Sequence, residues 1–355
     1  MTQKSFFEYL NIAHIERIHS QLLSWIISKD CEAMNAVSKN NFINNLFSLV
    51  GERQILNVET EHNNIDILIE TDCEIIIIEN KIKSSQHSNQ LERYQQYCDY
   101  KFKVVKPKFY YLTLIDENSN NDDWIRISYH KLFVALNQQT LIENSHSVIL
   151  KEYLNYLKKL TTVVEDFKSR TKDYDMVFLD GKKKKSDKIN FNYNNDFEKF
   201  IADNQLETIL QKSFLNRLKL QMSEVSSHIT DTRGDALIDF HIKNDIWYEN
   251  RNYATIIQLQ GKTIKFAFSI YGDKYGLSNK TWIEKIIPKM EYIALNNNLG
   301  YKKKCNKPTS KAYVSISKKM NINYWHMDLE ELSGFIREEI SNGKMLTETL
   351  INHLN

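Results

Sequence analysis

The sequence of 355 residues has little of what marks metal-cluster, secreted or membrane proteins. Its four cysteines are far apart and form no CxxC pair, which argues against a zinc knuckle, an iron–sulfur cluster and a disulfide framework. The N-terminus lacks the basic start and apolar core of a signal peptide. No run approaches the roughly 20 apolar residues that span a bilayer. We therefore expect a soluble cytoplasmic protein with no membrane partner.

Proline, glycine and net charge are also low. Three prolines and nine glycines leave no long flexible linker. The formal net charge is +2 at pH 7, so the chain is not a polycation, and any contact with nucleic acid must come from a local patch. Hydrophobic residues make up 42%, which is ample for a core, and the length suggests two domains or one enlarged domain.

Apolar periodicity divides the chain into helices and strands of both main types. The elements expected in the first half are helices at 6–27, 41–50, 85–100 and 147–167 and strands at 65–70, 75–82, 108–115 and 124–128. Those expected in the second half are helices at 196–225, 281–295 and from 329, and strands at 236–242, 253–260, 263–271 and 312–317. A charged stretch at 169–190 is the expected linker between a domain at 1–168 and an α+β domain at 191–355.

The segment IDILIETDCEIIIIENKI predicts a β-hairpin whose apolar strands end in charged residues. A turn centred on its Asp-Cys pair sets Asp66 directly opposite Glu79, where Cβ atoms lie roughly 4.5–5.5 Å apart. Strand alternation puts Glu79 and Lys81 on one face. Because two opposed carboxylates destabilise a sheet, a divalent cation between them would offset the cost, and Mg²⁺ prefers such ligands.

Asp66, Glu79 and Lys81 together provide the groups that phosphodiester hydrolysis needs. Lys81 can hold or deprotonate a nucleophilic water and stabilise charge on a phosphate. The structural alternative is that Glu79 and Lys81 mark the point where a buried strand reaches the surface. The D/E-x-K pattern occurs at three further places, but none of them follows an apolar run with an opposed upstream acid.

Two helices supply further candidates for the same site. Gln90 and Tyr94 are four residues apart, so they share a helical face and could contact a phosphate or base. The alternative is an amphipathic helix that packs Tyr94 on the sheet. In the N-terminal helix Glu16 could be a further metal ligand or orient a metal-bound water. A capping or solvent-facing role is the alternative for this residue.

A lysine-rich stretch in the second half carries no acid between Glu291 and Asp328. Such a stretch could track a phosphate backbone, and a plain basic surface is the alternative. Its residues that we place in contact with substrate are Lys302, Lys303 and Lys304.

These motifs, in this order, resemble the PD-(D/E)xK nuclease superfamily. The likeness rests on Asp66, on ENK after an isoleucine run, and on NQLERY soon after it. The pattern E-x-x-H-S-x-x-L that begins at Glu16 is similar to a bacterial branch of this superfamily. The likeness covers residues 6–115 and extends to 168. Ile65 stands where proline is common, and the cysteine cluster of some RecB-like nucleases is absent, which counts against exonuclease or helicase-coupled processing.

The resemblance implies an α/β, restriction-endonuclease-like core, with a mixed central sheet flanked by helices, and a C-terminal α+β domain for substrate choice or oligomerisation. It implies hydrolysis of nucleic acid, DNA more than RNA, with Mg²⁺ or Mn²⁺ as cofactor. By analogy it suggests bacterial defence against phage or plasmids. The implied roles are metal ligands for Asp66 and Glu79, an accessory acid for Glu16, contact with the attacking water for Lys81, and substrate contacts for Gln90 and Tyr94.

Two other functions stay open at this point. The same core could be a non-catalytic module that binds nucleic acid or a protein, although an intact Asp66, Glu79 and Lys81 set argues against it. It could also be an effector nuclease that is silent until a protein partner or homo-oligomerisation activates it.

Overall fold

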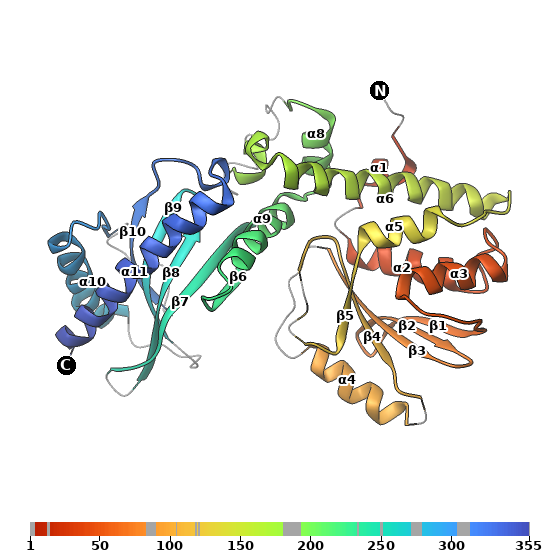
Figure 1. Cartoon of the computed structure of the whole chain (residues 1–355), viewed down its shortest axis with the longest axis horizontal. Coiled ribbons are helices and arrows are strands. Elements are labelled where there is room, and N and C mark those ends of the chain that lie inside the picture. The colour runs from red at the N-terminus through yellow and green to blue at the C-terminus, as the bar shows by residue number, and fades with distance from the viewer. Residues whose placement is uncertain are drawn as a thin grey trace. The chain divides into compact units, whose positions relative to one another are not determined.

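The computed structural model describes residues 4–12, 15–82, 90–103, 105–117, 119, 121–179, 193–232, 234–248, 251–270, 279–303 and 313–354. The chain forms two compact units. The first unit comprises Met1–Arg170 with Asn192–Ser213, and the second comprises Thr171–Phe191 with Phe214–Asn355. Each unit is built around one five-stranded sheet (Figure 1).

The sheet of the first unit is mixed and has the strand order β1-β2-β3-β4-β5. Its strands are β1 (Ile55–His62), β2 (Ile65–Thr71), β3 (Ile75–Lys81), β4 (Lys108–Thr113) and β5 (Trp124–Ser128). The first three strands are antiparallel neighbours, whereas β3, β4 and β5 run parallel. The carboxyl ends of these three parallel strands therefore lie on one edge of the sheet.

Helices cover both faces of this sheet, which confirms the predicted fold class (Figure 1). On one face, Leu91 and Cys98 of α4 pack in an apolar cluster with Leu68, Ile77 and Phe109 of the strands. The other face carries α2, α3 and α5. The helices of the first unit are α1 (Phe6–Leu10), α2 (Glu16–Ile27), α3 (Ala36–Phe47), α4 (Gln90–Lys101), α5 (Tyr129–Asn137), α6 (Ser145–Ser169) and α8 (Asp196–Asp203). Helix α9 (Glu207–Gln221) begins in the first unit, and its residues from Phe214 on belong to the second.

The predicted hairpin has the predicted register. Ile67 lies opposite Ile78 in the antiparallel β2–β3 pair, and the same register continues to the turn. One further step along the ladder brings Asp66 level with Glu79. Every residue of β3 is buried, so the charged end of this strand is held inside the protein.

The single helix predicted at 6–27 is wrong, because the structure has two helices there. Helix α1 ends at Asn11, which has a φ of 51° and ends the helix in the left-handed conformation. Asparagine tolerates this conformation better than most residues, so it ends a helix without glycine. Helix α2 then begins at Glu16, and this restart fixes where its motif lies.

Two other predicted helices also differ from those observed. The helix predicted at 41–50 lies earlier, since the Asn35 side chain caps the start of α3 and Ser48 ends it at a φ of 54°. The helix predicted at 196–225 is two helices, α8 and α9, with Gln205 at a φ of 52° between them.

Parts of several predicted segments fall outside the described residues. They are residues 13–14 of the helix at 6–27, residues 85–89 of the helix at 85–100, residues 180–190 of the charged linker, residue 271 of the strand at 263–271 and residue 312 of the strand at 312–317. The described start of the linker forms two short 3₁₀ helices, η1 (Thr171–Asp173) and η2 (Asp175–Phe178).

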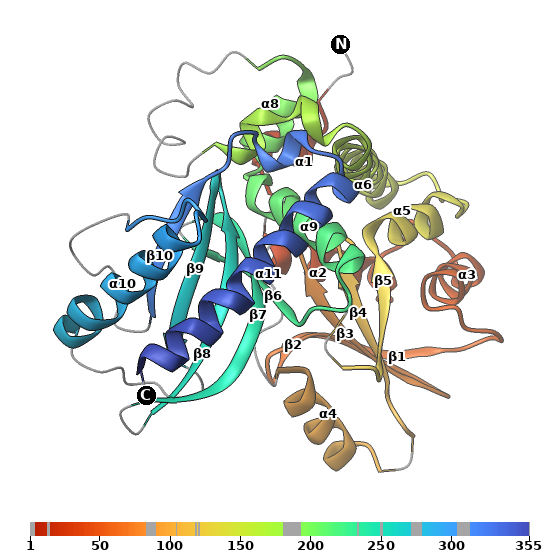
Figure 2. The same ribbon diagram turned by 60° about the vertical axis from the view of Figure 1, so that its left-hand side comes forward.

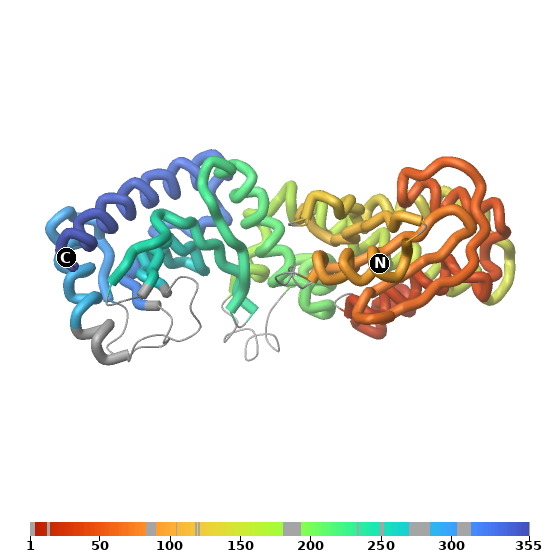
Figure 3. The backbone as a smooth tube through the Cα atoms, turned by 90° about the horizontal axis from the view of Figure 1, so that it is seen from below, coloured from red at the N-terminus to blue at the C-terminus, as the bar shows by residue number. Residues whose placement is uncertain are grey.

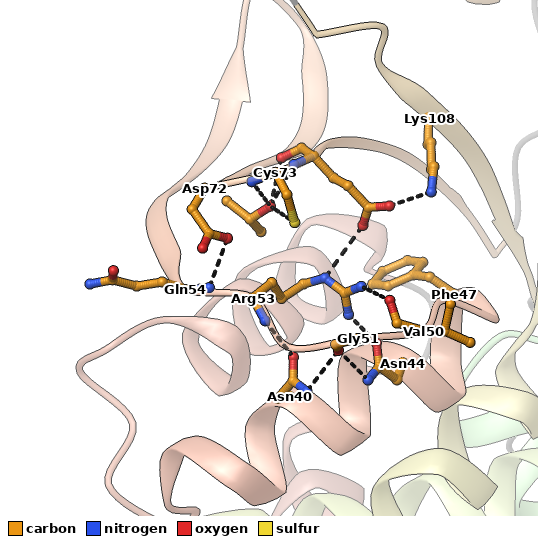
Figure 4. A network of polar contacts seen from close by, with 12 residues as sticks. Asn40, Asn44, Phe47, Val50, Gly51, Arg53, Gln54, Asp72, Cys73 and Lys108 are labelled. Carbon is orange, nitrogen blue, oxygen red and sulfur yellow. Dashed lines mark hydrogen bonds and ion pairs between the residues drawn. The ribbon is translucent and has the colours of Figure 1, made fainter.

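A buried arginine joins α3, the entry to β1 and the start of β3 (Figure 4). The Arg53 side chain is 1% exposed, and its Nε lies 3.3 Å from Glu74 Oε2. Its two terminal nitrogens donate to Asn44 Oδ1 and to the Val50 carbonyl. Glu74 also pairs with Lys108 at the rim of this cluster. We call these five residues the Arg53 cluster.

The second unit has an antiparallel sheet with the order β10-β9-β8-β7-β6, as the predicted α+β arrangement requires. Helix α11 runs along this sheet over β7 and β8 (Figures 2 and 3). A Cβ atom on Gly343 would lie 2.3 Å from Ile242, so the missing side chain allows α11 its close approach. The elements are β6 (Ser227–Thr232), β7 (Asp235–Tyr248), β8 (Arg251–Gln260), β9 (Thr263–Ile270), α10 (Asn279–Asn296), β10 (Tyr313–Lys319), η3 (Tyr324–His326) and α11 (Leu329–Leu354).

Within the described ranges, every helix is too short or too polar to cross a lipid bilayer.

Candidate active site

Predicted site residues of the first unit meet at the carboxyl end of β3. The Lys81 ammonium lies 2.6 Å from Glu79 Oε1, and Gln90 donates to the same oxygen at 2.8 Å. Asp66 lies on the neighbouring strand, and its Oδ2 accepts from the backbone N–H of Asn80 at 2.7 Å. The structure thus brings together Asp66, Glu79, Lys81 and Gln90.

Glu16 and Tyr94 complete this group from two helices. Glu16 is the first residue of α2, and its Oε1 accepts from the backbone N–H of Ile82, just beyond β3, at 2.8 Å. Tyr94 accepts a hydrogen bond from Gln90 at 2.6 Å and donates to the Asn64 carbonyl at 2.5 Å. Its ring also packs in the apolar cluster under α4, so Tyr94 has both a packing contact and a contact in the site.

Burial and like charge shift the pKa values of the two central carboxyls. The pKa of Glu79 is raised to about 8, first by burial and then by the nearby Asp66, although Lys81 acts in the opposite direction. Burial raises the pKa of Asp66 to about 6, with the Asn80 N–H and Lys81 opposing it. For Lys81, burial acts to lower the pKa, but Glu79, Glu16 and Asp66 together raise it. Lys81 is therefore a cation at neutral pH.

The side chains of Asp66, Glu79 and Glu16 each accept a hydrogen bond from a protein donor. The described residues contain no group of three or more His, Cys, Asp or Glu side chains arranged to hold a metal ion. However, Glu79 Oε2 is buried and has no hydrogen-bond partner within the described ranges. A buried carboxylate oxygen left unpaired is costly, and an oxygen-rich set with two carboxylates is what Mg²⁺ takes. The donor chemistry of Asp66 and Glu79 therefore fits a hard divalent cation.

Asn80 is a site residue that the sequence reasoning missed. It lies between Glu79 and Lys81 but points to the opposite face, where it is fully buried. Its Nδ2 donates to the Glu16 carbonyl and to Ser20 Oγ, both at 3.0 Å. Its Oδ1 accepts from the Tyr129 hydroxyl at 2.8 Å. The Asn80 side chain thus links α2 and α5 to β3, the strand that carries Glu79 and Lys81.

We expect Asn80→Ala to lower the free energy of unfolding of the first unit by about 3 kcal/mol, because it leaves several buried polar groups unpaired. Tyr129→Phe removes one bond of the same network, and about 1 kcal/mol is expected. Urea unfolding of both variants at pH 7 measures the difference. Equal losses for the two variants would show that Asn80 does not connect these elements.

His19 of the E-x-x-H-S motif is a core residue. It is 2% exposed, and its Nδ1 is hydrogen-bonded to the Tyr153 hydroxyl at 2.9 Å. Its ring stacks on that of Tyr156. Burial lowers the pKa of His19 to about 3, so the imidazole is neutral in the folded protein at all ordinary pH values.

This lowered pKa predicts a pH-dependent stability. The unfolded chain protonates His19 near pH 6.5, whereas the folded protein resists protonation down to about pH 3. For this residue the unfolded state binds more protons between these values, so the contribution of His19 to stability falls as the pH is lowered through this window. Between pH 7 and pH 5 that contribution should fall by about 2 kcal/mol. In urea unfolding, the difference in stability between wild type and His19→Phe should therefore change by this amount between the two pH values, whereas the difference between wild type and His130→Phe, at an exposed histidine, should stay constant.

The predicted lysine contacts belong to the second unit. The backbone of Lys302 forms a β-bridge with Ser317, and the Lys303 N–H donates to Glu291. Lys304 lies outside the described residues. Lys318, from the same basic stretch, is ion-paired with Glu339 at 2.6 Å, so it is already neutralised within the protein.

A comparison with known families gives the class of this protein. The sequence model of the PD-(D/E)XK nuclease superfamily matches residues 4–229, which is more than half of the chain and includes all the residues gathered around Glu79. The chain belongs to the PD-(D/E)XK nuclease superfamily, as its motifs predicted. No curated protein and no solved structure matched it.

Proposed function

We propose that the protein is a Mg²⁺-dependent nuclease that hydrolyses the phosphodiester bonds of DNA, with Mn²⁺ as an alternative cofactor. The observation that carries this proposal is the environment of Glu79. Its Oε1 is paired with the Lys81 ammonium, while its Oε2 is buried and without a partner in the described part of the chain. In a member of a nuclease superfamily, this arrangement supports a cation site next to a fixed lysine.

Each side chain then has a separate task. Asp66 and Glu79 would hold the ion, with Glu16 as an accessory acid. The bound ion would act as a Lewis acid on the phosphate and lower the pKa of a coordinated water. Because its pKa is raised, Lys81 stays protonated, so it positions the attacking water and stabilises charge on the phosphate as a donor. Gln90, which already donates to Glu79, would also contact the substrate backbone.

We further propose that Tyr94 steadies the substrate beside Gln90, and that the second unit serves substrate choice or oligomerisation. In this proposal Lys302, Lys303 and Lys304 contact the phosphate backbone. By analogy with nucleases of this kind, the DNA cut is that of a phage or plasmid. A protein partner or homo-oligomer would act as the activator of this nuclease.

Cleavage assays with matched substrates test the proposed function. Purified protein is incubated with supercoiled plasmid, linear duplex, single-stranded DNA and RNA, in Mg²⁺, Mn²⁺ or EDTA. We expect DNA to be cut in either metal, RNA to be cut more slowly and EDTA to stop the reaction. Cutting that persists in EDTA would contradict the metal-dependent mechanism. Binding without cutting in every arm would instead support the non-catalytic module.

A further inference from the structure

A cavity lies on the same edge of the first sheet as the candidate active site. It has a volume of about 650 Å³ and opens where β4 and β5 end and α5 begins, with α6 forming its far wall. Cavities of this size are typical of ligand sites. We call it the Lys131 pocket, and the other charged side chains in its wall are Asp116, Arg126, Glu165 and Lys168.

The strand register connects this pocket to the candidate active site. Glu79 of β3 is level with Tyr111 of β4, which in turn is level with Arg126 of β5. Two residues further along, Lys81 of β3 is level with Thr113 of β4, which is level with Ser128 of β5. Because neighbouring strands lie about 4.8 Å apart, β5 is about 10 Å from β3 across the sheet. The pocket therefore opens two strands away from the proposed catalytic residues, with Arg126 level with Glu79 and with Lys131 on α5, the helix on the face opposite to α4.

The charges of the pocket wall favour an anion. It contains three cationic side chains and two carboxylates. Both carboxylates are already paired, since Lys168 contacts Asp116 at 2.6 Å and Glu165 at 2.8 Å, and Arg126 also pairs with Asp116. Lys131, the remaining charged side chain of the pocket wall, forms no ion pair within the described ranges. One positive charge is thus left without a counterion.

Lys131 also keeps unused donors. The Lys131 ammonium donates to Ser48 Oγ at 2.8 Å, and an ammonium group has three N–H donors. Burial lowers the pKa of Lys131, so a neighbouring anion would stabilise its charged form. A phosphate group has the charge and the acceptors that this ammonium lacks.

We propose that the Lys131 pocket binds a backbone phosphate of the nucleic-acid substrate, one that flanks the phosphate cleaved beside Lys81. This inference rests on the proposed function and adds a subsite to it. One strand of a duplex carries a phosphate for about every 3.4 Å of helix axis. A strand whose scissile phosphate is at Lys81 therefore has further phosphates within reach of β5.

Salt-dependent binding of a labelled duplex in EDTA tests this proposal. Lys131→Met should weaken binding about tenfold and reduce the slope of log K against log salt by about 0.9, the value for one lost phosphate contact. Lys131→Arg should retain both. The matched control is Lys151→Met, since Lys151 lies on α6 outside the pocket and pairs with Glu143. In cleavage, Lys131→Met should raise KM and leave kcat within twofold.

Neutral phosphate analogues locate the contact. A series of duplexes carries one methylphosphonate at successive positions around the cleavage site. We expect one flanking position to weaken binding to the wild type but not to Lys131→Met. If no position behaves in this way, or if Lys131→Met keeps the wild-type salt slope, the pocket does not bind substrate, and a wild type that still cuts leaves the nuclease function intact. A wild type that neither binds nor cuts DNA overturns both proposals.

Discussion

Replacing Lys81 by Met should lower kcat for DNA cleavage about 10²–10³-fold, the usual cost of losing one donor aimed at developing charge. The reason is the position of the ammonium, which is fixed at 2.6 Å from Glu79 and buried with it. No other lysine or arginine in the described residues is ion-paired with Glu79, so nothing nearby takes over. Initial rates under saturating Mg²⁺ measure the effect.

The Lys81→Met variant also separates catalysis from metal binding. Because it removes a positive charge beside the proposed ion, its affinity for Mn²⁺ should equal or exceed that of the wild type while cleavage is lost. Lys158→Met, at an exposed lysine of α6, is the matched control and should cut at the normal rate. A Lys81→Met protein that cuts within twofold of the wild type would remove Lys81 from the mechanism.

Arg53→Met should lower the free energy of unfolding of the first unit by about 3–5 kcal/mol, as expected when one partner of a buried ion pair is removed. The Arg53 side chain is almost completely buried, and its loss leaves Glu74 Oε2 without its ion-pair partner. It also leaves the Val50 carbonyl and the Asn44 side chain without the donor that holds them (Figure 4). Urea unfolding at pH 7 measures the loss.

Lys108→Met is the matched control in the Arg53 cluster. It removes the other cation paired with Glu74, but this lysine side chain is 41% exposed, so a loss below about 1 kcal/mol is expected. In the double variant Arg53→Met/Glu74→Leu, much of the loss should be recovered, because no unpaired charge stays buried. Equal losses for Arg53→Met and Lys108→Met would show that burial does not govern this cluster.

The hairpin could be predicted from sequence because its information is local. Apolar alternation and a short polar turn fix which residues of β2 and β3 face each other, and the structure has Ile67 opposite Ile78 as predicted. The contact of Lys81 with Glu79 follows from strand alternation alone. Helical spacing made Gln90 a candidate for the same site, and the resemblance favoured this assignment over simple packing, because periodicity alone does not show where a helix packs.

Elements without a clear apolar pattern were not predicted. Strand β1 has no fully buried residue, so its sequence lacks the alternation that identifies a half-buried strand. The helix breaks at Asn11 and Gln205 depend on non-glycine residues in the left-handed conformation. Such residues are a weak sequence signal for the end of a helix. In each case the tertiary structure decides what the local sequence leaves open.

The role of Asn80 could not be predicted for a different reason. Its partner Tyr129 is 49 residues away in the sequence, and Ser20 is 60 residues away. The local sequence around each of these residues indicates only a helix or a strand and gives no sign of the contact. The E-x-x-H-S pattern indicated that α2 matters, but the use of its serine to hold β3 appears only when the helix is packed on the sheet.

Calorimetric titration with Mn²⁺ at pH 7 tests most directly whether Asp66 and Glu79 form a metal centre. Burial and the nearby Asp66 raise the pKa of Glu79, and a carboxyl must be deprotonated to bind a metal ion. We therefore predict that metal binding releases protons and that the affinity rises from pH 6 to pH 8. Asp66→Asn and Glu79→Gln should abolish binding, whereas Glu61→Gln, at a neighbouring acid, should preserve it. Equal Mn²⁺ affinity in the wild type and Glu79→Gln would contradict the proposed centre.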